Sequence, residues 1–450
     1  MKLLNIITRK CNKNFSGLLN SNHLTRNLEN ITNPNDINDL TPTETYGPHI
    51  HHSTKWLHDA YLTEPDPNKN LTVDVLRLSS HCGQLLSDKP TRLLSKQDTI
   101  IKIYKTALKL SVMDKIMYDS QRQGRISFYM TSTGEEISTI STAAALKSQD
   151  VVFTQYRELG VFLWRGYSFQ NIMDQCYATQ DDITKGKQMP IHFSMSKLNL
   201  PSISSPIGTQ ICQAAGAAYA IKLENGNKTL DKCVCVFFGD GASSQGDAHA
   251  AFNMASVLGS PIIFVCRNNG FAISTSALEQ YSQKSVGGLA GRGLSYGMPA
   301  IRVDGNDVFA VYEAMKLARQ YVVENKEPVF VELLTYRLGH HSTSDESKSY
   351  RDKNEIKNWL ENYNPIDRLE RYLFSNNMMN KEKSLKIKKE YKTELLKTIS
   401  LTEEKKKVSI NKLFEDVYDE MTPELKRQQA DLNQHLKIYG DKYPLKQFKK

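Results

Sequence analysis

The chain has 450 residues, of which 40 % are hydrophobic, and a net charge of +9. This length allows two or three domains with a substantial buried core. No apolar run approaches the roughly 20 residues that span a bilayer, which excludes a transmembrane protein. The seven cysteines lack metal-like spacing, which argues against a disulfide framework and against a zinc site.

The positive charge is concentrated at the N-terminus. Residues 1–28 carry five basic side chains and no acidic one, which accounts for +5 of the +9. This segment also lacks the long apolar core of a secretory signal, so it predicts a mitochondrial transit peptide and a location in the mitochondrial matrix. A disordered basic tail is the alternative. Because the excess charge is local, we do not expect the protein to bind nucleic acid.

Residues 29–94 are rich in Asn, Asp, Pro and His with little periodicity, and they predict an extended arm. Four histidines of this arm could suggest a metal site, namely His49, His51, His52 and His58. No second cluster of ligands with matching spacing accompanies them, so we expect them at the surface.

Residues 95–350 alternate between helical and strand patterns. A helix with Ser95 or Asp98 as its cap is expected to run to about Arg122. Short apolar runs predict strands at residues 151–153, 233–238, 261–266, 301–305 and 328–337. Helices are expected between them, including residues 246–258 and a helix from an Asn306 cap to about Glu324. This order predicts an α/β fold with a doubly wound parallel sheet.

Residues 351–450 change to a charged, lysine-rich pattern. The spacing predicts amphipathic helices at residues 381–398, 410–420 and 423–439. We expect their charged faces to be solvated and to carry no chemistry.

Two turns of the central region carry a recognisable motif. The strand at residues 233–238 is followed by Gly239-Asp240-Gly241, and the strand at residues 261–266 by Arg267-Asn268-Asn269. The carboxyl ends of parallel strands share the edge at which α/β sheets bind ligands. A carboxylate, an amide oxygen and backbone carbonyls suit magnesium, while an arginine and helix-opening amides suit a diphosphate. Gly-Asp-Gly alone fits an ordinary βα turn, but with Asn-Asn about thirty residues later it resembles the thiamine diphosphate motif.

From about Lys102 to the C-terminus, the chain resembles the alpha subunits of branched-chain 2-oxo acid dehydrogenases. The matching stretches are residues 120–130, 155–158, 246–250, 267–270, 336–345 and 443–445. The related pyruvate dehydrogenase alpha subunits usually have Glu at the position of Arg267 and one His where this chain has His340 and His341. Both differences favour the branched-chain family, whereas residues 30–100 match it poorly.

The resemblance implies a site for thiamine diphosphate, magnesium and potassium. The residues implied to contact thiamine diphosphate are Tyr156, Arg157, Ser205, Gly241, Ala242, Arg267 and His341, with Ser205 near the aminopyrimidine. Those implied to hold magnesium are Asp240, Asn269 and the carbonyl of Phe271, and those for potassium are Ser204, Pro206, Thr209 and Gln210. His341 is implied to act in acid/base catalysis. His340 and His249 are expected to be structural.

The family decarboxylates branched-chain 2-oxo acids oxidatively and transfers the acyl group to the lipoyl groups of an acyltransferase core. Thiamine activation needs an acidic residue at the aminopyrimidine, usually from a second α/β domain, and only one such domain is predicted here. We therefore expect an α2β2 heterotetramer in which a beta subunit completes the site. The resemblance also implies a regulatory kinase and phosphatase that act at Ser342. The alternatives are a pyruvate or acetoin dehydrogenase alpha subunit and a non-catalytic α/β scaffold.

Overall fold

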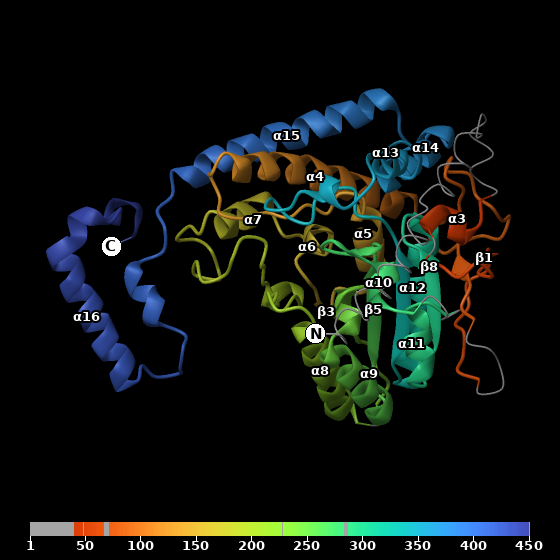
Figure 1. The fold of residues 1–450 in the computed structure, drawn as a ribbon, viewed down its shortest axis with the longest axis horizontal. Helices are drawn as coiled ribbons and strands as arrows, with labels where there is room; N and C mark the ends of the chain where they lie inside the picture. Colours follow the sequence, from red (N-terminus) through yellow and green to blue (C-terminus); the bar gives the residue numbers. More distant parts are fainter. Residues whose placement is uncertain (1–39, 48, 67–71, 227, 283–286, 450) are drawn as a thin grey trace, which may run out of the picture.

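The computed structural model describes residues 40–47, 49–66, 72–226, 228–282 and 287–449, and the predicted transit peptide lies outside these ranges. A seven-stranded, wholly parallel sheet with the order β1-β2-β8-β9-β5-β4-β3 forms its centre (Figure 1). The strands are β1 (Trp56–Leu57), β2 (Val75–Leu76), β3 (Val151–Phe153), β4 (Val234–Gly239), β5 (Ile262–Asn268), β8 (Ala300–Asp304) and β9 (Val329–Leu334). The predicted α/β fold with a parallel sheet is confirmed.

Helices cover both faces of the sheet. One face carries α4 (Gln97–Arg122), α5 (Glu136–Ala145) and α12 (Val308–Asn325), and the other carries α8 (Thr209–Asn225), α9 (Gly246–Leu258) and α11 (Ala290–Ser295). Strand β4 shows why both faces need a cover: Cys235 and Phe237 pack on the first side, and Val236 and Phe238 on the second. Side chains alternate along a strand, so a continuous apolar run buries both faces.

Short helices and one hairpin complete the central region. They are α3 (Pro42–Tyr46), α6 (Leu159–Trp164), α7 (Phe169–Cys176), α10 (Ala277–Gln280) and the antiparallel pair β6 (Phe271–Ala272) and β7 (Thr275–Ser276). In the described part of the chain, every helix is too short or too polar to span a bilayer.

The N-terminal arm contributes two strands that the sequence did not predict. Val75 of β2 pairs with Arg302 of β8, and Trp56 of β1 pairs with Val75. Each strand has only two residues, which is too short for a periodic signal. The arm therefore extends the sheet.

The arm histidines differ in their exposure. Among the described residues, no group of three or more His, Cys, Asp or Glu could hold a metal ion. His52 and His58 are exposed, as expected. His49 differs, because it is half-buried beside Gly270, and burial lowers its pKa to about 4.

Two predicted helix caps are wrong by one or two positions. Lys96 precedes α4 without a side-chain capping bond, so neither Ser95 nor Asp98 acts as its N-cap. Asp307, rather than Asn306, caps α12 through the amides of its first turn. The Asp307 carboxylate also accepts hydrogen bonds from two arm amides, at 2.6 and 2.7 Å. This contact fixes the arm to α12, which local sequence rules could not reveal.

The C-terminal region contains α13 (Lys353–Asn362), α14 (Pro365–Ser375), α15 (Lys381–Glu403) and α16 (Pro423–Tyr439). Helix α15 lies along α4, whereas α16 lies at the end of the molecule away from the sheet (Figure 1). The helix predicted at residues 410–420 is wrong, because only a 3-10 turn at Ile410–Phe414 forms there. No residue of α16 is buried.

Phe252 of α9 provides a test of the second core. Its ring is fully buried and lies 4.9 Å from Phe264 and 5.5 Å from Phe330, between ring centroids. Phe252→Ala leaves a cavity and should lower the free energy of unfolding by about 3–5 kcal/mol, measured by urea denaturation. Val257 on the same helix is 76 % exposed, so Val257→Ala should change the free energy of unfolding by less than about 0.5 kcal/mol. Equal effects of both variants would contradict this packing.

Candidate functional site

The carboxyl ends of four neighbouring strands bring the predicted residues to one edge of the sheet. Asp240 follows β4 and Asn269 follows β5, while Arg157 and His341 lie a few residues beyond β3 and β9. The strands are parallel and adjacent, so their ends meet. This edge is the candidate site.

The predicted magnesium ligands are oxygen atoms with defined neighbours. Asp240 is 2 % exposed, and its Oδ2 accepts a 2.6 Å hydrogen bond from Nε2 of Gln280. Burial raises the pKa of the Asp240 carboxyl. The Nδ2 of Asn269 donates to Oε1 of Glu135 at 2.9 Å. The other atom of this amide group, Oδ1, therefore points away from Glu135 and can accept a hydrogen bond or bind a metal ion. Its only donor among the described residues is the amide of Phe271, at 3.1 Å. This oxygen-rich donor set fits magnesium.

The backbone beside Asp240 is closely packed. A Cβ atom on Gly241 would lie only 2.6 Å from the Cβ of Ala272, so the turn after β4 requires glycine to approach the hairpin that follows β5. Ala242 opens a 3-10 turn, Ala242–Ser244, directly before α9. The backbone amides of this segment are suitable donors for a phosphate.

Two arginines surround His341. Nδ1 of His341 lies 3.1 Å from Nη2 of Arg157 and 3.3 Å from Nη1 of Arg337. Burial and these two guanidinium groups lower the pKa of His341 to about 3, so its ring is neutral at physiological pH. The ring of Tyr156 lies 6.2 Å from that of His341, edge to face. Tyr156, Arg157 and His341 therefore lie close together.

Arg267 differs from the sequence-based expectation in its surroundings. Its guanidinium is buried, forms an ion pair with Glu135 and donates to Oε1 of Glu158 at 2.8 Å. Two carboxylates thus balance its charge within the protein. Among the described residues, neither Arg157 nor Arg337 forms such an ion pair. These two arginines are better placed by charge to attract a diphosphate.

Sequence reasoning assigned no role to Arg337 or Glu135. Arg337 lies three residues beyond β9, so the rule that selected Arg157 after β3 could also have selected it. Glu135 gives no comparable signal, because its partners Arg267 and Asn269 are more than 130 residues away in sequence.

The residues of the predicted potassium site lie at the start of α8. Thr209 is its first residue, and its hydroxyl donates to the Pro206 carbonyl at 3.2 Å. Gln210 is 2 % exposed and donates through Nε2 to the Phe237 carbonyl at 3.0 Å. Its Oε1 is buried and has no hydrogen-bond partner among the described residues. The buried Oε1 of Gln210, which lacks a hydrogen-bond partner among these residues, is a suitable ligand for a monovalent cation.

Ser205 and the remaining histidines have separate contacts. The Ser205 hydroxyl lies 2.7 Å from Nε2 of His192. His340 accepts a 3.0 Å hydrogen bond from the amide of Ser347. His249 is exposed, and its Nδ1 lies 2.9 Å from the Tyr296 hydroxyl.

The segment that follows β9 is held by a network centred on Asp345. Oδ2 of Asp345 accepts hydrogen bonds from the His341 amide at 2.7 Å and the Tyr350 hydroxyl at 2.6 Å. Arg337 donates to the same Tyr350 hydroxyl at 2.7 Å. Ser342 is 8 % exposed, and its Oγ accepts from the Ser344 amide at 3.2 Å.

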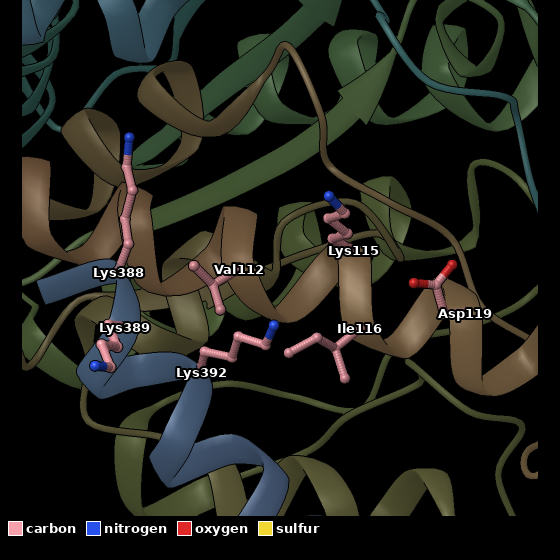
Figure 2. Close-up of a pocket in the computed structure, with 7 residues that line it drawn as sticks. All are labelled: Val112, Lys115, Ile116, Asp119, Lys388, Lys389 and Lys392. Atoms are coloured by element: carbon pink, nitrogen blue, oxygen red, sulfur yellow. The ribbon is translucent and has the colours of Figure 1, made fainter. Parts of the chain in front are cut away.

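A hollow of about 340 Å³ lies between α4 and α15 and shares no residue with this site (Figure 2). Its lining residues are Val112, Lys115, Ile116, Asp119, Lys388, Lys389 and Lys392. Three of its four lysines are exposed, and Lys388 is half-buried. The hollow is therefore part of the solvated charged face predicted for the C-terminal helices.

Comparisons with known proteins agree with this geometry. The family model described as "Dehydrogenase E1 component" matches residues 104–411. The chain belongs to the dehydrogenase E1 component family. It is 48 % identical over 371 residues to the 2-oxoisovalerate dehydrogenase subunit alpha, mitochondrial, of Caenorhabditis elegans, covering 82 % of this chain and 84 % of that protein.

Other family members are similarly close. The protein with the same name from Dictyostelium discoideum is 51 % identical over 353 residues, covering 78 % of each chain. The Homo sapiens protein with that name is 46 % identical over 384 residues, covering 85 % of this chain and 84 % of the relative.

Asp240→Asn tests the metal site. The variant keeps an oxygen that can accept from Gln280 but removes the carboxylate charge. Because burial raises the pKa of this carboxyl, its loss should not lower the melting temperature without metal. We expect the magnesium-dependent affinity for thiamine diphosphate to fall at least tenfold. This affinity is measured by fluorescence titration of the chain assembled with the expected beta subunit. Asp247→Asn is the control, because Asp247 is exposed on α9. Unchanged affinity of the Asp240 variant would contradict the site.

Proposed function

We propose that this chain is the alpha subunit of a mitochondrial branched-chain 2-oxo acid dehydrogenase that uses thiamine diphosphate with magnesium. The main support is the meeting of Asp240 and Asn269 with Arg157 and His341 at one sheet edge, in a chain about half identical to 2-oxoisovalerate dehydrogenase alpha subunits. We further propose that the acyl group produced by decarboxylation of the 2-oxo acid passes to the lipoyl groups of an acyltransferase core.

The chain's own residues bind and orient the cofactor. Asp240, Asn269 and the Phe271 carbonyl would hold magnesium, while Arg157 and Arg337 would attract the diphosphate. When bound, thiamine diphosphate supplies the carbanion and the electron sink that decarboxylation of a 2-oxo acid requires. The neutral ring of His341 can exchange a proton at Nε2, because the arginines contact Nδ1.

Potassium is proposed at the start of α8, with Ser204, Pro206, Thr209 and Gln210 as ligands. The unpartnered Oε1 of Gln210 supports a cation there. A bound ion would order the segment that carries Ser205 and so stabilise the neighbouring part of the site.

A beta subunit is proposed to complete the site in an α2β2 heterotetramer. The buried acids Glu135 and Glu158 both pair with Arg267, which leaves neither free to act on the aminopyrimidine. The C-terminal region also exposes large apolar side chains. They include Leu413 at 63 %, Val417 at 54 %, Tyr418 at 64 %, Ile438 at 62 % and Tyr443 at 47 %. Such a surface is typical of a protein interface.

The substrate can be tested directly. With purified beta subunit and an artificial electron acceptor, we expect decarboxylation of 3-methyl-2-oxobutanoate with at least tenfold higher kcat/KM than pyruvate. The alpha chain alone should be inactive, because it lacks the residue that acts on the aminopyrimidine. A preference for pyruvate would instead favour a pyruvate dehydrogenase alpha subunit. Absence of both activities in an assembled complex that binds no cofactor would support the scaffold alternative.

We also propose that a kinase and a phosphatase regulate the enzyme at Ser342. Ser342 adjoins His341 in the segment held by Asp345. A phosphate there would add about −1.5 to −2 charges, which would compete with the diphosphate for the arginines around His341. Since Ser342 is buried, it must also move outward to accommodate the group. Both effects would disorder the segment.

Ser342→Glu should therefore abolish decarboxylation and leave assembly with the beta subunit intact. Ser349→Glu is a matched control, because Ser349 is exposed in the same segment. Activity is measured with the artificial acceptor, assembly by size-exclusion chromatography, and order of the segment by limited proteolysis. Ser342→Ala should resist inactivation by the kinase. An active Ser342→Glu complex would contradict the proposal, and a kinase that still inactivates Ser342→Ala would move the regulatory site elsewhere.

A further inference from the structure

The hollow between α4 and α15 combines an apolar floor with a basic rim (Figure 2). Its floor consists of Val112 and Ile116 of α4, which are half-buried, and Ile116 packs against the main core. Its rim carries four lysines, namely Lys115 of α4 and Lys388, Lys389 and Lys392 of α15. The hollow, about 340 Å³ in volume, therefore offers a recessed apolar surface surrounded by ammonium groups.

The charges of this rim are not balanced within the described part of the chain. Among those residues, Lys115, Lys389 and Lys392 form no ion pair, and Lys388 forms one long ion pair, at 3.9 Å. The seven described residues that line the hollow include one acid, Asp119. Figure 2 shows this acid at the end of the hollow away from Lys388 and Lys389. The other end therefore has an excess of positive charge, which attracts acidic groups.

One exposed face of α15 continues this surface beyond the hollow. Leu385, Lys389, Lys392 and Leu396 are spaced by four, three and four residues, so they lie on one face of the helix. Leu385 is 56 % exposed and Leu396 is 46 % exposed. The buried side chains of the helix are Ser384, Leu395, Ile399 and Thr402. The exposed face that borders the hollow thus combines apolar and basic side chains.

The lysines of α15 explain why the hollow stays open. The stem of a lysine can cover apolar surface, but its ammonium group remains in water. Apolar side chains at the positions of Lys388 and Lys392 could instead fill the space over Val112 and Ile116. Because lysines occupy these positions, the floor stays accessible from solvent. The floor is recessed, so a protruding side chain can reach it, whereas a flat surface such as a lipid bilayer would meet the lysines alone.

We propose that the hollow is a docking site for an acidic segment of another protein, which places an apolar side chain on Val112 and Ile116. The carboxylates of this segment then lie among the rim lysines, and further apolar side chains contact the exposed leucines of α15. An amphipathic helix satisfies both conditions, because positions three and four residues apart lie on one face. The hollow shares no residue with the candidate site, so docking here is independent of the proposed function.

Synthetic peptides test the chemistry of the docking site. The probe is a fluorescein-labelled helical peptide with leucines at positions i, i+3, i+4 and i+7 and glutamates elsewhere. In one reference peptide every glutamate is replaced by lysine, and in the other every leucine is replaced by serine. Each peptide is titrated into the chain assembled with the beta subunit, and fluorescence anisotropy gives the Kd. We expect the acidic leucine peptide to bind at least about tenfold more tightly than either reference.

Two charge-reversal variants locate the binding. The double variant Lys389→Glu/Lys392→Glu should raise the Kd of the acidic leucine peptide at least about tenfold, because it reverses the charge of the rim. The matched control is Lys383→Glu/Lys397→Glu, which makes the same change of charge on the same helix in lysines that do not line the hollow. At physiological ionic strength we expect its Kd to stay within about threefold of wild type, because salt screens charges outside the contact. All four lysines are exposed, so both variants should keep the wild-type melting temperature.

Several outcomes would overturn the inference. If the acidic leucine peptide does not bind, or binds Lys389→Glu/Lys392→Glu as well as wild type, the hollow is not its docking site. Equal weakening by both double variants would show attraction by the overall charge of α15. Equal binding of the serine peptide would exclude a role for the apolar floor. Sedimentation with phosphatidylglycerol vesicles that depends on Lys389 and Lys392, and with which the peptide does not compete, would show a membrane contact instead.

Discussion

The buried ion pairs of Arg267 are the interaction on which the geometry of the site depends. Arg267 lies at the end of β5, Glu135 immediately precedes α5, and Glu158 immediately precedes α6. All three side chains are buried, so removing Arg267 would leave two buried carboxylates without their cation, at a cost of about 3–5 kcal/mol. Burial alone would raise the pKa of Glu135, but Arg267 and Arg157 hold it below its usual value. The two ion pairs of Arg267 therefore hold the three segments together.

This cluster also orients the side chain of Asn269, a proposed magnesium ligand. Glu135 uses Oε1 for both Arg267 and the Nδ2 group of Asn269. Because a carboxylate can only accept here, the Asn269 amide cannot be reversed without placing two oxygens together. Its carbonyl oxygen is thereby directed away from Glu135. Arg267 thus orients the Asn269 oxygen of the proposed magnesium site through Glu135, in addition to any direct contact with the diphosphate.

The sequence predicted those parts of the fold and site that follow from local pattern. Strand β4 and helix α9 could be located because a continuous apolar run ended in Gly-Asp-Gly before a helical pattern. Adjacent parallel strands then placed Asp240 near Asn269 without any knowledge of their contacts. Strands β1 and β2 have no such pattern. The pairing of Arg267 with Glu135 was equally hidden, because it depends on the spatial order of the strands and not on residue spacing. The resemblance supplied most of the individual ligands, but it did not indicate which arginine charges are already balanced.

The pKa of Asp240 is raised and that of His341 is lowered, and together these shifts indicate which ligand charges the candidate site favours. The Asp240 carboxyl has a raised pKa because burial disfavours its charge by more than the hydrogen bond from Gln280 and the charge of Arg267 compensate. The His341 ring has a lowered pKa because it is buried beside the guanidinium groups of Arg157 and Arg337. A cation at Asp240 would reverse the first shift, and an anion between the arginines would reverse the second. A magnesium diphosphate carries both charges in one ligand. The fold holds Asp240 and the two arginines in position before binding. The unfavourable electrostatics at Asp240 and between the arginines would therefore favour binding of a ligand that carries a cation at one end and an anion at the other.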